Sequence, residues 1–150
     1  MRTLRRFIRL PWRKQRALLA AGVMITTVRA GMRLVSFETL RRYLSRLARG
    51  RSVRETPADQ AEIDTIVWSL QTAGRTLPPA GRCLIEALAG HVLLGRKGLA
   101  TDLRIGVARD ADGAFKAHAW LERGGNIVLG ELGAELEQYT PFPALRGLEH

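Results

Sequence analysis

Two periodicities divide the hydrophobic and polar positions along the chain. In the first part, apolar residues recur at helical spacing and predict four helices, over residues 12–31, 37–49, 56–74 and 82–96. After Gly98 the period falls from about 3.6 to about 2, and the alternation predicts strands around residues 102–107, 115–123 and 126–131. Helices followed by an antiparallel meander are typical of an α+β fold rather than of a doubly wound sheet.

Capping residues mark the ends of the predicted helices. Ser36 is placed to cap the second helix, and Thr56 followed by a proline begins the third. Gly31 is expected to end the first helix and Gly74 the third. The segment Gly95-Arg-Lys-Gly98 follows a helix rather than a strand, so we interpret it as a helix C-cap and not as a phosphate-binding loop.

Positive charge is concentrated near the N-terminus. The 150 residues suit one domain and include 24 basic and 14 acidic residues, a net charge of +10. Residues 1–49 hold 13 of the basic residues but one acidic residue, Glu38, so the remainder carries a net charge of −2. This segment suits an anionic membrane or a nucleic acid. Because it matches no helix-turn-helix or RNA-binding signature, we expect no nucleic-acid partner and favour a membrane surface or a protein partner.

The N-terminal segment also contains the longest uncharged apolar stretch. It runs from Ala17 to Val28 and has 12 residues, whereas a membrane-spanning helix needs about 20. The Arg-rich residues before it resemble the start of a signal peptide, but no small-x-small cleavage site follows. We therefore expect neither a spanning helix nor export, and a cytoplasmic location. The last three residues, 148–150, resemble the start of a histidine tag and are set aside.

Cys83 is the single cysteine of the chain. It excludes an intramolecular disulfide and a multi-cysteine metal site, and it fits a reducing compartment. Its position at the predicted start of the fourth helix would stabilise a thiolate, because unpaired backbone N–H groups and the helix dipole favour negative charge there. A nucleophile is one interpretation. The other is a small core residue, which is the commoner use of a free cysteine.

His118 lies on the second predicted strand between two alanines, which leave room for an opposing group. Alone, it is most simply a hydrogen-bonded strand residue. Together with Cys83 it predicts a nucleophile and base, the pair that cysteine acyl-transfer enzymes require. The remaining internal histidine, His91, is expected to be a satisfied helix residue, since no second His or Cys lies at metal spacing. We therefore expect no metal and no cofactor.

A third group should orient the imidazole of His118. If Gly124-Gly125 is a two-residue hairpin loop, the pairing that starts at Arg123 and Asn126 ends with His118 opposite Glu131. Glu131 is therefore the expected orienting group, although a solvated residue is the alternative and one change of register would remove the contact. The rival Glu122 lies about 13 Å along the strand, too far for a direct hydrogen bond.

Five short motifs follow one another along the chain: Gly81-Arg-Cys83-Leu-Ile-Glu-Ala87-Leu, Leu93-Leu-Gly-Arg-Lys-Gly98-Leu, Ile105-Gly-Val107, Ala117-His118-Ala-Trp120-Leu-Glu122 and Tyr139-Thr-Pro141. Taken in this order, they resemble the transglutaminase-like leader peptidase of lasso-peptide biosynthesis. The length is similar to that of its split form, in which a separate protein recognises the leader, and the basic helices of residues 1–49 resemble the N-terminal region of that family.

The resemblance implies a papain-like cysteine peptidase core over residues 51–147, preceded by a basic helical region over residues 1–50. Cys83 matches the nucleophile of the family and His118 its base. Where the family usually has an aspartate, this chain has Gly130 followed by Glu131, so the third member is a glutamate or the enzyme works as a dyad. The implied partners are the precursor peptide, a separate leader-recognition protein and, as a further candidate, the macrolactam cyclase. The alternatives are a basic docking module and a cysteine acyltransferase or amidase of another pathway.

Overall fold

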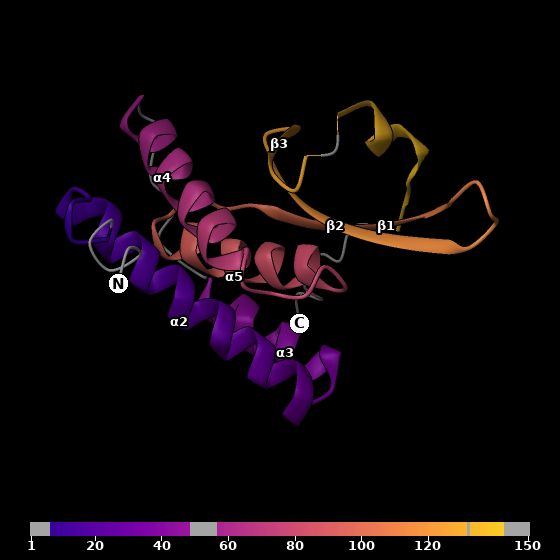
Figure 1. Ribbon diagram of the computed structural model, residues 1–150, viewed down its shortest axis with the longest axis horizontal. Helices are drawn as coiled ribbons and strands as arrows, with labels where there is room; N and C mark the ends of the chain where they lie inside the picture. The colour runs from indigo at the N-terminus through magenta and orange to yellow at the C-terminus, as the bar shows by residue number, and fades with distance from the viewer. Residues whose placement is uncertain (1–6, 49–56, 132, 143–150) are drawn as a thin grey trace.

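The computed structural model describes residues 7–48, 57–131 and 133–142 (Figure 1). Its helices are α2 (Trp12–Leu34), α3 (Phe37–Leu47), α4 (Pro57–Gly74) and α5 (Arg82–Arg96). Its strands are β1 (Asp102–Arg109), β2 (Phe115–Arg123), β3 (Asn126–Leu129) and β4 (Thr140–Pro141), and the short 3-10 helix η1 (Gly133–Gln138) precedes β4. The strands form one antiparallel sheet in the order β3-β2-β1-β4. The predicted α+β fold is confirmed, whereas Thr56 and residues 148–150 lie outside the described residues.

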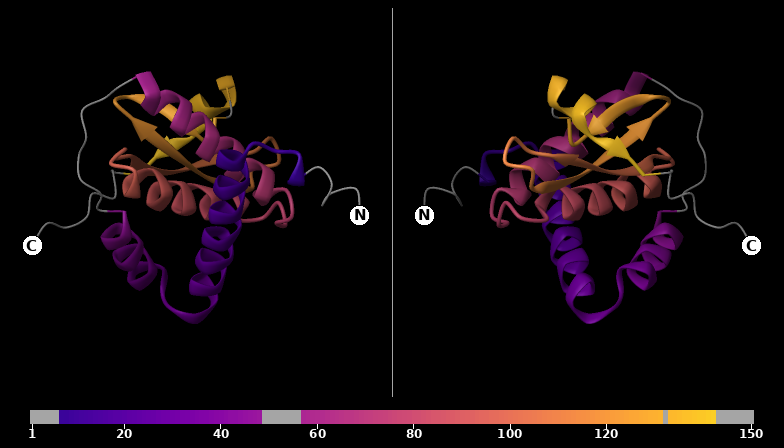
Figure 2. Two further views of the ribbon diagram at one scale, coloured as in Figure 1. Left: turned by 90° about the vertical axis from the view of Figure 1, so that its left-hand side faces the viewer. Right: turned by 90° about the vertical axis from the view of Figure 1, so that its right-hand side faces the viewer.

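Helix α5 is the centre of the fold. It contacts α2, α3 and α4 as well as β1 and β2, and nine of its 15 residues are buried. Gly90 lets this helix approach the sheet closely, because a Cβ there would lie 2.9 Å from the side chains of Leu121 and Leu129. Figure 2 shows α5 against the sheet and the α2–α3 pair extending away from it. The helix that begins next to Cys83 is thus held by tertiary contacts on several faces.

The caps of the helices agree in part with the sequence prediction. Ser36 caps α3, since its hydroxyl accepts a hydrogen bond of 3.3 Å from the backbone N–H of Thr39. The C-cap of α5 is also confirmed, with Gly98 at a φ of 80° and its N–H donating to the carbonyl of Gly95 at 2.9 Å.

Gly31 does not end α2, so that prediction was wrong. The helix continues to Leu34, and the N–H of Val35 donates to the carbonyl of Gly31 at 3.0 Å. The side chain of Leu40 lies over the glycine, where a Cβ would be 2.6 Å from Leu40 Cδ1. The glycine therefore serves the close approach of α3 to α2, which a local pattern cannot distinguish from a helix end.

The hairpin of β2 and β3 contains an irregularity that the sequence prediction lacked. Arg123 pairs with Asn126 and Glu122 with Ile127, as expected for a two-residue loop. A register shift follows, and Leu121 then pairs with Leu129 instead of Val128. The strand β3 ends at Leu129 rather than at residue 131. Such a bulge inserts one residue and changes which side chains lie opposite each other beyond it.

The N-terminal helices share the hydrophobic core with the rest of the chain. Ala21, Ile25 and Val28 of α2 belong to the same buried cluster as Leu70 of α4 and Leu88 of α5. Among the described helices, α2 is also the one that is long and apolar enough to cross a membrane by length and composition. Its buried face is accounted for by this packing, and its opposite face is exposed.

Candidate active site

Cys83 occupies the second position of α5. The preceding Gly81 has a φ of 77°, a left-handed conformation that favours glycine, and it lets the chain turn sharply into the helix. The carbonyl of Gly81 accepts the N–H of Ile85 at 3.1 Å, so the helix begins there. The thiol of Cys83 is half-buried, and its side chain packs at the margin of the core. This placement leaves the sulfur accessible at a helix start.

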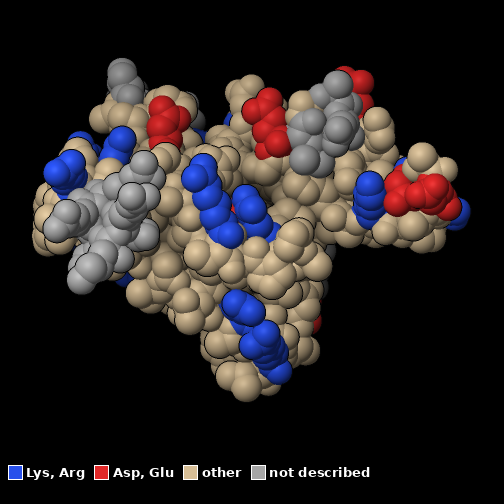
Figure 3. All heavy atoms as spheres, in the orientation of Figure 1, with Lys and Arg blue, Asp and Glu red and all other residues tan. Residues whose placement is uncertain are grey.

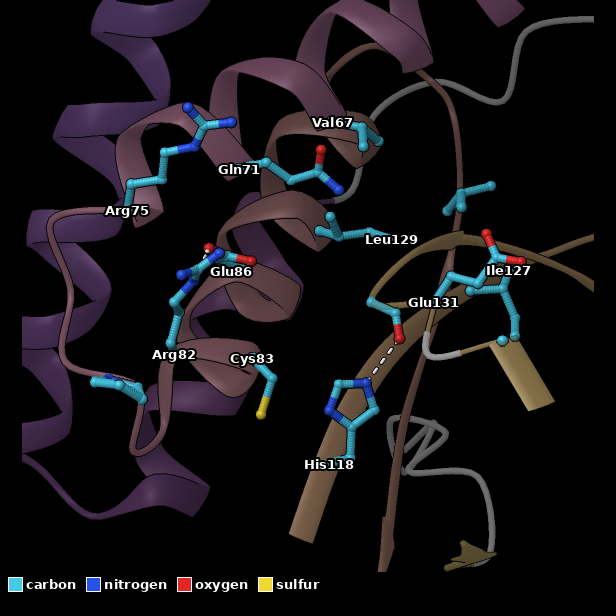
Figure 4. Close-up of a pocket in the computed structure, with 14 residues that line it drawn as sticks. Val67, Gln71, Arg75, Arg82, Cys83, Glu86, His118, Ile127, Leu129 and Glu131 are labelled. Atoms are coloured by element: carbon cyan, nitrogen blue, oxygen red, sulfur yellow. Dashed lines mark hydrogen bonds and ion pairs between the residues drawn. The ribbon is translucent and has the colours of Figure 1, made fainter. Parts of the chain in front are cut away.

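His118 lies on β2 and faces Cys83 (Figure 4). The Nε2 atom of the imidazole is 2.7 Å from the carbonyl oxygen of Gly130, and the other ring nitrogen, Nδ1, points toward the sulfur of Cys83. The ring of Trp120 stacks beside the imidazole at a centroid distance of 6.1 Å, and the ring of Tyr139 lies at 5.7 Å. Both aromatic rings and the carbonyl restrict the orientation of His118.

The contact with Gly130 determines the tautomer of His118. A carbonyl oxygen only accepts hydrogen bonds, so Nε2 must carry the hydrogen and donate it. Nδ1 then either accepts the proton of the Cys83 thiol or, once it holds that proton, faces the thiolate as an imidazolium. Proton exchange between sulfur and nitrogen is therefore the one acid–base step that this geometry offers.

The two side chains change each other's acidity. The pKa of the Cys83 thiol is lowered, first by the interaction with His118 and further by the backbone N–H groups of Ala119 and Leu84, while burial opposes the change. The pKa of the His118 imidazole is raised, first by Cys83 and then by the carbonyl of Gly130, again against burial. Both directions favour a thiolate beside an imidazolium.

Glu131 does not face His118, and the register that predicted this contact was wrong. The bulge before Leu129 shifts the chain, and the carbonyl of Gly130 takes the place next to the imidazole. Figure 4 shows the carboxylate of Glu131 pointing away from His118, on an exposed residue at the rim of the cleft.

Glu122, the other carboxylate considered as an orienting group for His118, forms its contacts with other residues. It forms an ion pair of 3.0 Å with Arg104 and accepts a hydrogen bond of 2.8 Å from the indole of Trp120.

The positioning groups of His118 were not predicted from the sequence. The ring of Trp120 could have been found, because positions two apart on a strand share a face. The carbonyl of Gly130 and the ring of Tyr139 carried no local signal, since their approach depends on the bulge and on the segment after η1.

An open cleft of about 850 Å³ contains both Cys83 and His118 in its lining. One wall is formed by Val67 and Gln71 on one face of α4 and by Arg75 directly after that helix. The other wall is the edge strand β3 and the residues directly after it. In Figure 4, Gln71 of the first wall and Leu129 and Ile127 of the second lie above Cys83 and His118. The site is therefore open to an elongated molecule.

The cleft also contains an ion pair near Cys83. Glu86 lies one helical turn after Cys83 and is buried, with 8% of its surface exposed, and its carboxylate is 2.8 Å from Nε of Arg82. The carboxylate packs against Gly74, the last residue of α4. This pair joins the start of α5 to the end of α4 and so fixes the floor of the cleft.

His91 is a hydrogen-bonded residue of α5, as the sequence predicted. Its Nδ1 lies 3.0 Å from the hydroxyl of Thr101, and burial lowers the pKa of its imidazole. Within the described part of the chain, no group of three His, Cys, Asp or Glu side chains is arranged to hold a metal ion.

Comparison with known proteins identifies the family to which the chain belongs. The model of the transglutaminase-like superfamily matches residues 24–144, a region that begins within α2 and extends past β4. No curated protein and no solved structure matches the chain. The superfamily includes cysteine peptidases and acyltransferases and is typically cysteine-dependent. With a match over most of its length, and with an α+β fold that agrees with it, the chain belongs to the transglutaminase-like superfamily.

Proposed function

We propose that this protein is a cysteine peptidase that removes the leader from a ribosomally made lasso-peptide precursor, together with a separate leader-recognition protein. The observation that carries the chemistry is the fixed tautomer of His118, whose Nδ1 faces the thiol of Cys83 inside an open cleft. The ordered motifs that resemble the lasso leader peptidase supply the substrate class. Residues at the site and family membership are both consistent with this activity.

The mechanism begins with transfer of the thiol proton of Cys83 to Nδ1 of His118. The thiolate attacks the scissile carbonyl and forms a tetrahedral intermediate. The oxyanion of this intermediate accepts a hydrogen bond from the backbone N–H of Cys83 at the helix start. His118 then gives its Nδ1 proton to the leaving amine as the C–N bond breaks. In the second half, neutral His118 takes a proton from water and the hydroxide attacks the thioester. The C–S bond then breaks, His118 returns its proton to the sulfur, and the carboxylic acid product leaves.

The cleft suits an extended peptide. The strand β3 is at the edge of the sheet, and its residues Ile127, Val128 and Leu129 line the cleft. In a two-residue hairpin the pair after the closing pair directs its backbone groups outward, so the N–H and C=O of Ile127 point away from β2. A substrate strand can pair with these groups and bring its scissile bond to Cys83.

Mass spectrometry of a lasso-type precursor tests this proposal. The precursor is incubated with the recognition protein and with the parent chain, Cys83→Ala, His118→Gln or His91→Gln. We expect cleavage at one bond by the parent and by His91→Gln, the matched control outside the site. Cys83→Ala should be inactive, and His118→Gln should lose about a hundredfold or more.

Two results would contradict the proposal. A matched precursor that stays intact while its recognition protein demonstrably binds it would exclude the leader-peptidase assignment. Transfer of the acyl group to an added amine in preference to water would instead assign an acyltransferase, which the same acyl-enzyme chemistry permits.

A further inference from the structure

The turn between α2 and α3 forms a projecting apolar point. We define the hairpin apex as Met32, Leu34, Val35 and Phe37, four large hydrophobic residues that are all exposed. Leu34 has 82% of its surface in solvent and is not part of the hydrophobic core cluster. Figure 2 shows α2 and α3 meeting at this point, away from the sheet. The apex is therefore convex and remote from the catalytic cleft.

Exposed hydrophobic residues are concentrated on these two helices and the residues next to them. Of the twelve large hydrophobic residues that are exposed in the described part of the chain, ten lie between residues 8 and 47. The other two, Phe115 and Phe142, belong to the sheet region. Scattered single hydrophobic residues are normal on a soluble surface, but a concentration in one region marks an interaction surface.

The outer face of α2 continues the apolar surface away from the apex. Leu19 and Val23 are exposed on this face, and no charged residue lies between Arg16 and Arg29. The hydroxyl of Thr27 donates to the carbonyl of Val23 at 2.9 Å, so this polar group is satisfied inside the helix. The face can leave water without breaking a hydrogen bond.

Arginines surround the apolar apex. Residues 29–47 contain five arginines and one acidic residue, Glu38, which forms ion pairs of 3.1 Å with Arg41 and 3.2 Å with Arg42. The excess positive charge includes Arg29 and Arg33 in the last turns of α2. Figure 3 shows basic side chains among mostly uncharged residues at the lower tip of the molecule. An apolar tip flanked by arginines suits the surface of a bilayer, because the apolar side chains can enter the acyl-chain region while the arginines stay among the anionic headgroups.

We infer that the hairpin apex docks this protein on the surface of an anionic bilayer. The convex shape favours a bilayer over a protein partner, because a projecting point needs a matching pocket in a protein but none in a fluid interface. Binding at the surface also fits the packing of α2 better than spanning does. A spanning position would withdraw Ala21, Ile25 and Val28 from the core that they share with α4 and α5.

Co-sedimentation of the full chain with lipid vesicles tests the inference. One set of vesicles is pure phosphatidylcholine and the other contains one quarter phosphatidylglycerol. We expect binding to the anionic vesicles, little binding to the neutral ones, and weaker binding as the salt concentration rises. Leu34→Ser should weaken binding by about fivefold or more, since it removes an inserted side chain. Arg33→Gln should weaken it by about fivefold.

Phe115→Ser is the matched control. Phe115 is also a large exposed hydrophobic residue, with 70% of its surface in solvent, but it lies on β2. Its substitution should leave vesicle binding unchanged, and all variants should keep the parent's circular dichroism spectrum.

Three outcomes would overturn the inference: no sedimentation with anionic vesicles, equal binding by Leu34→Ser and the parent, or a parent dimer that Leu34→Ser converts to a monomer. The last would assign the apex to a second copy of the chain. Because cleavage is not measured, the result is independent of the proposed peptidase activity.

Discussion

The imidazole of His118 is held by a backbone carbonyl, with Nε2 of His118 2.7 Å from the oxygen of Gly130. An orienting carboxylate can be protonated in acid and then loses its negative charge, whereas an amide carbonyl does not titrate in the physiological range. The acceptor that orients His118 is therefore independent of pH. The acid limb of a profile of kcat/KM against pH should therefore report the ionisation of Cys83 and His118 rather than that of a third group.

The thiol of Cys83 should be reactive at a pH below that of an ordinary cysteine. Its pKa is lowered by His118, so the thiolate is present below the usual thiol pKa of about 8.5. The rate of alkylation by iodoacetamide, measured by mass spectrometry at a series of pH values, reports the fraction of Cys83 that is thiolate. We expect the midpoint of the parent below the ordinary value and the midpoint of His118→Gln above that of the parent. Identical curves for the two proteins would show that His118 does not ionise the thiol.

Glu131→Gln should leave cleavage nearly intact. The carboxylate does not contact His118, whose partner is the neighbouring carbonyl. The loss in kcat/KM should be far below the about hundredfold that follows removal of a participating acid or base. Steady-state kinetics with the precursor measure it. A loss of a hundredfold or more would restore Glu131 to the mechanism.

Gly130→Ala should damage both stability and the site. Gly130 has a φ of 87°, and a Cβ there would lie 2.8 Å from the carbonyl of Ala119 and 3.0 Å from Trp120. We expect a loss of about 1–3 kcal/mol in the free energy of unfolding, measured by urea titration. The displaced carbonyl should also raise the pH midpoint of Cys83 alkylation.

Gly125→Ala is the control for this substitution. Gly125 has a φ of 82°, but nothing lies within 4 Å of the added Cβ. Gly125→Ala should lower the free energy of unfolding by about 1 kcal/mol through backbone strain and leave the pH midpoint of Cys83 alkylation unchanged. If Gly130→Ala also left that midpoint unchanged, the carbonyl would have no part in positioning His118.

The stability of the fold should decrease in mild acid through His91. Burial lowers the pKa of this imidazole, so the folded state resists protonation while the unfolded chain accepts a proton. The stability that neutral His91 contributes is complete above about pH 6.5 and is lost as the pH falls below it. Urea titrations near pH 7.5 and near pH 5.5 measure the loss.

His91→Gln keeps a side chain that can bond to Thr101 but does not titrate, so it should lose less stability over this interval. Both proteins contain His118, and the comparison therefore isolates His91. Equal losses in the two proteins would show that His91 is protonated as readily in the folded state as in the unfolded one.

Much of the local structure follows from neighbouring residues. Ser36 predicted the start of α3, and the alternation of apolar and polar residues predicted β1 and β2. These signals are reliable because a cap or a strand face depends on groups a few residues apart. The sequence also singled out Cys83 and His118, since each residue type had a distinctive local setting.

Other features depended on segments distant in the sequence. Gly31 has the same local pattern whether it ends a helix or lies under Leu40, and the packing of α3 on α2 decided between the two. The strand β4 was not predicted, because two residues carry almost no periodic signal; its pairing with Gly106 and Val107 of β1 creates it.

The sequence by itself determined the order of the four helices and the first three strands, the basic N-terminal segment and the two reactive side chains. The tertiary structure decided what orients them. A single bulge in the β2–β3 hairpin moved Glu131 away and brought the carbonyl of Gly130 to His118. A one-residue shift costs little in local conformation but reverses which groups face each other. Packing of β3 against α5 and the conformation of Gly130 therefore made a choice that no local pattern contains.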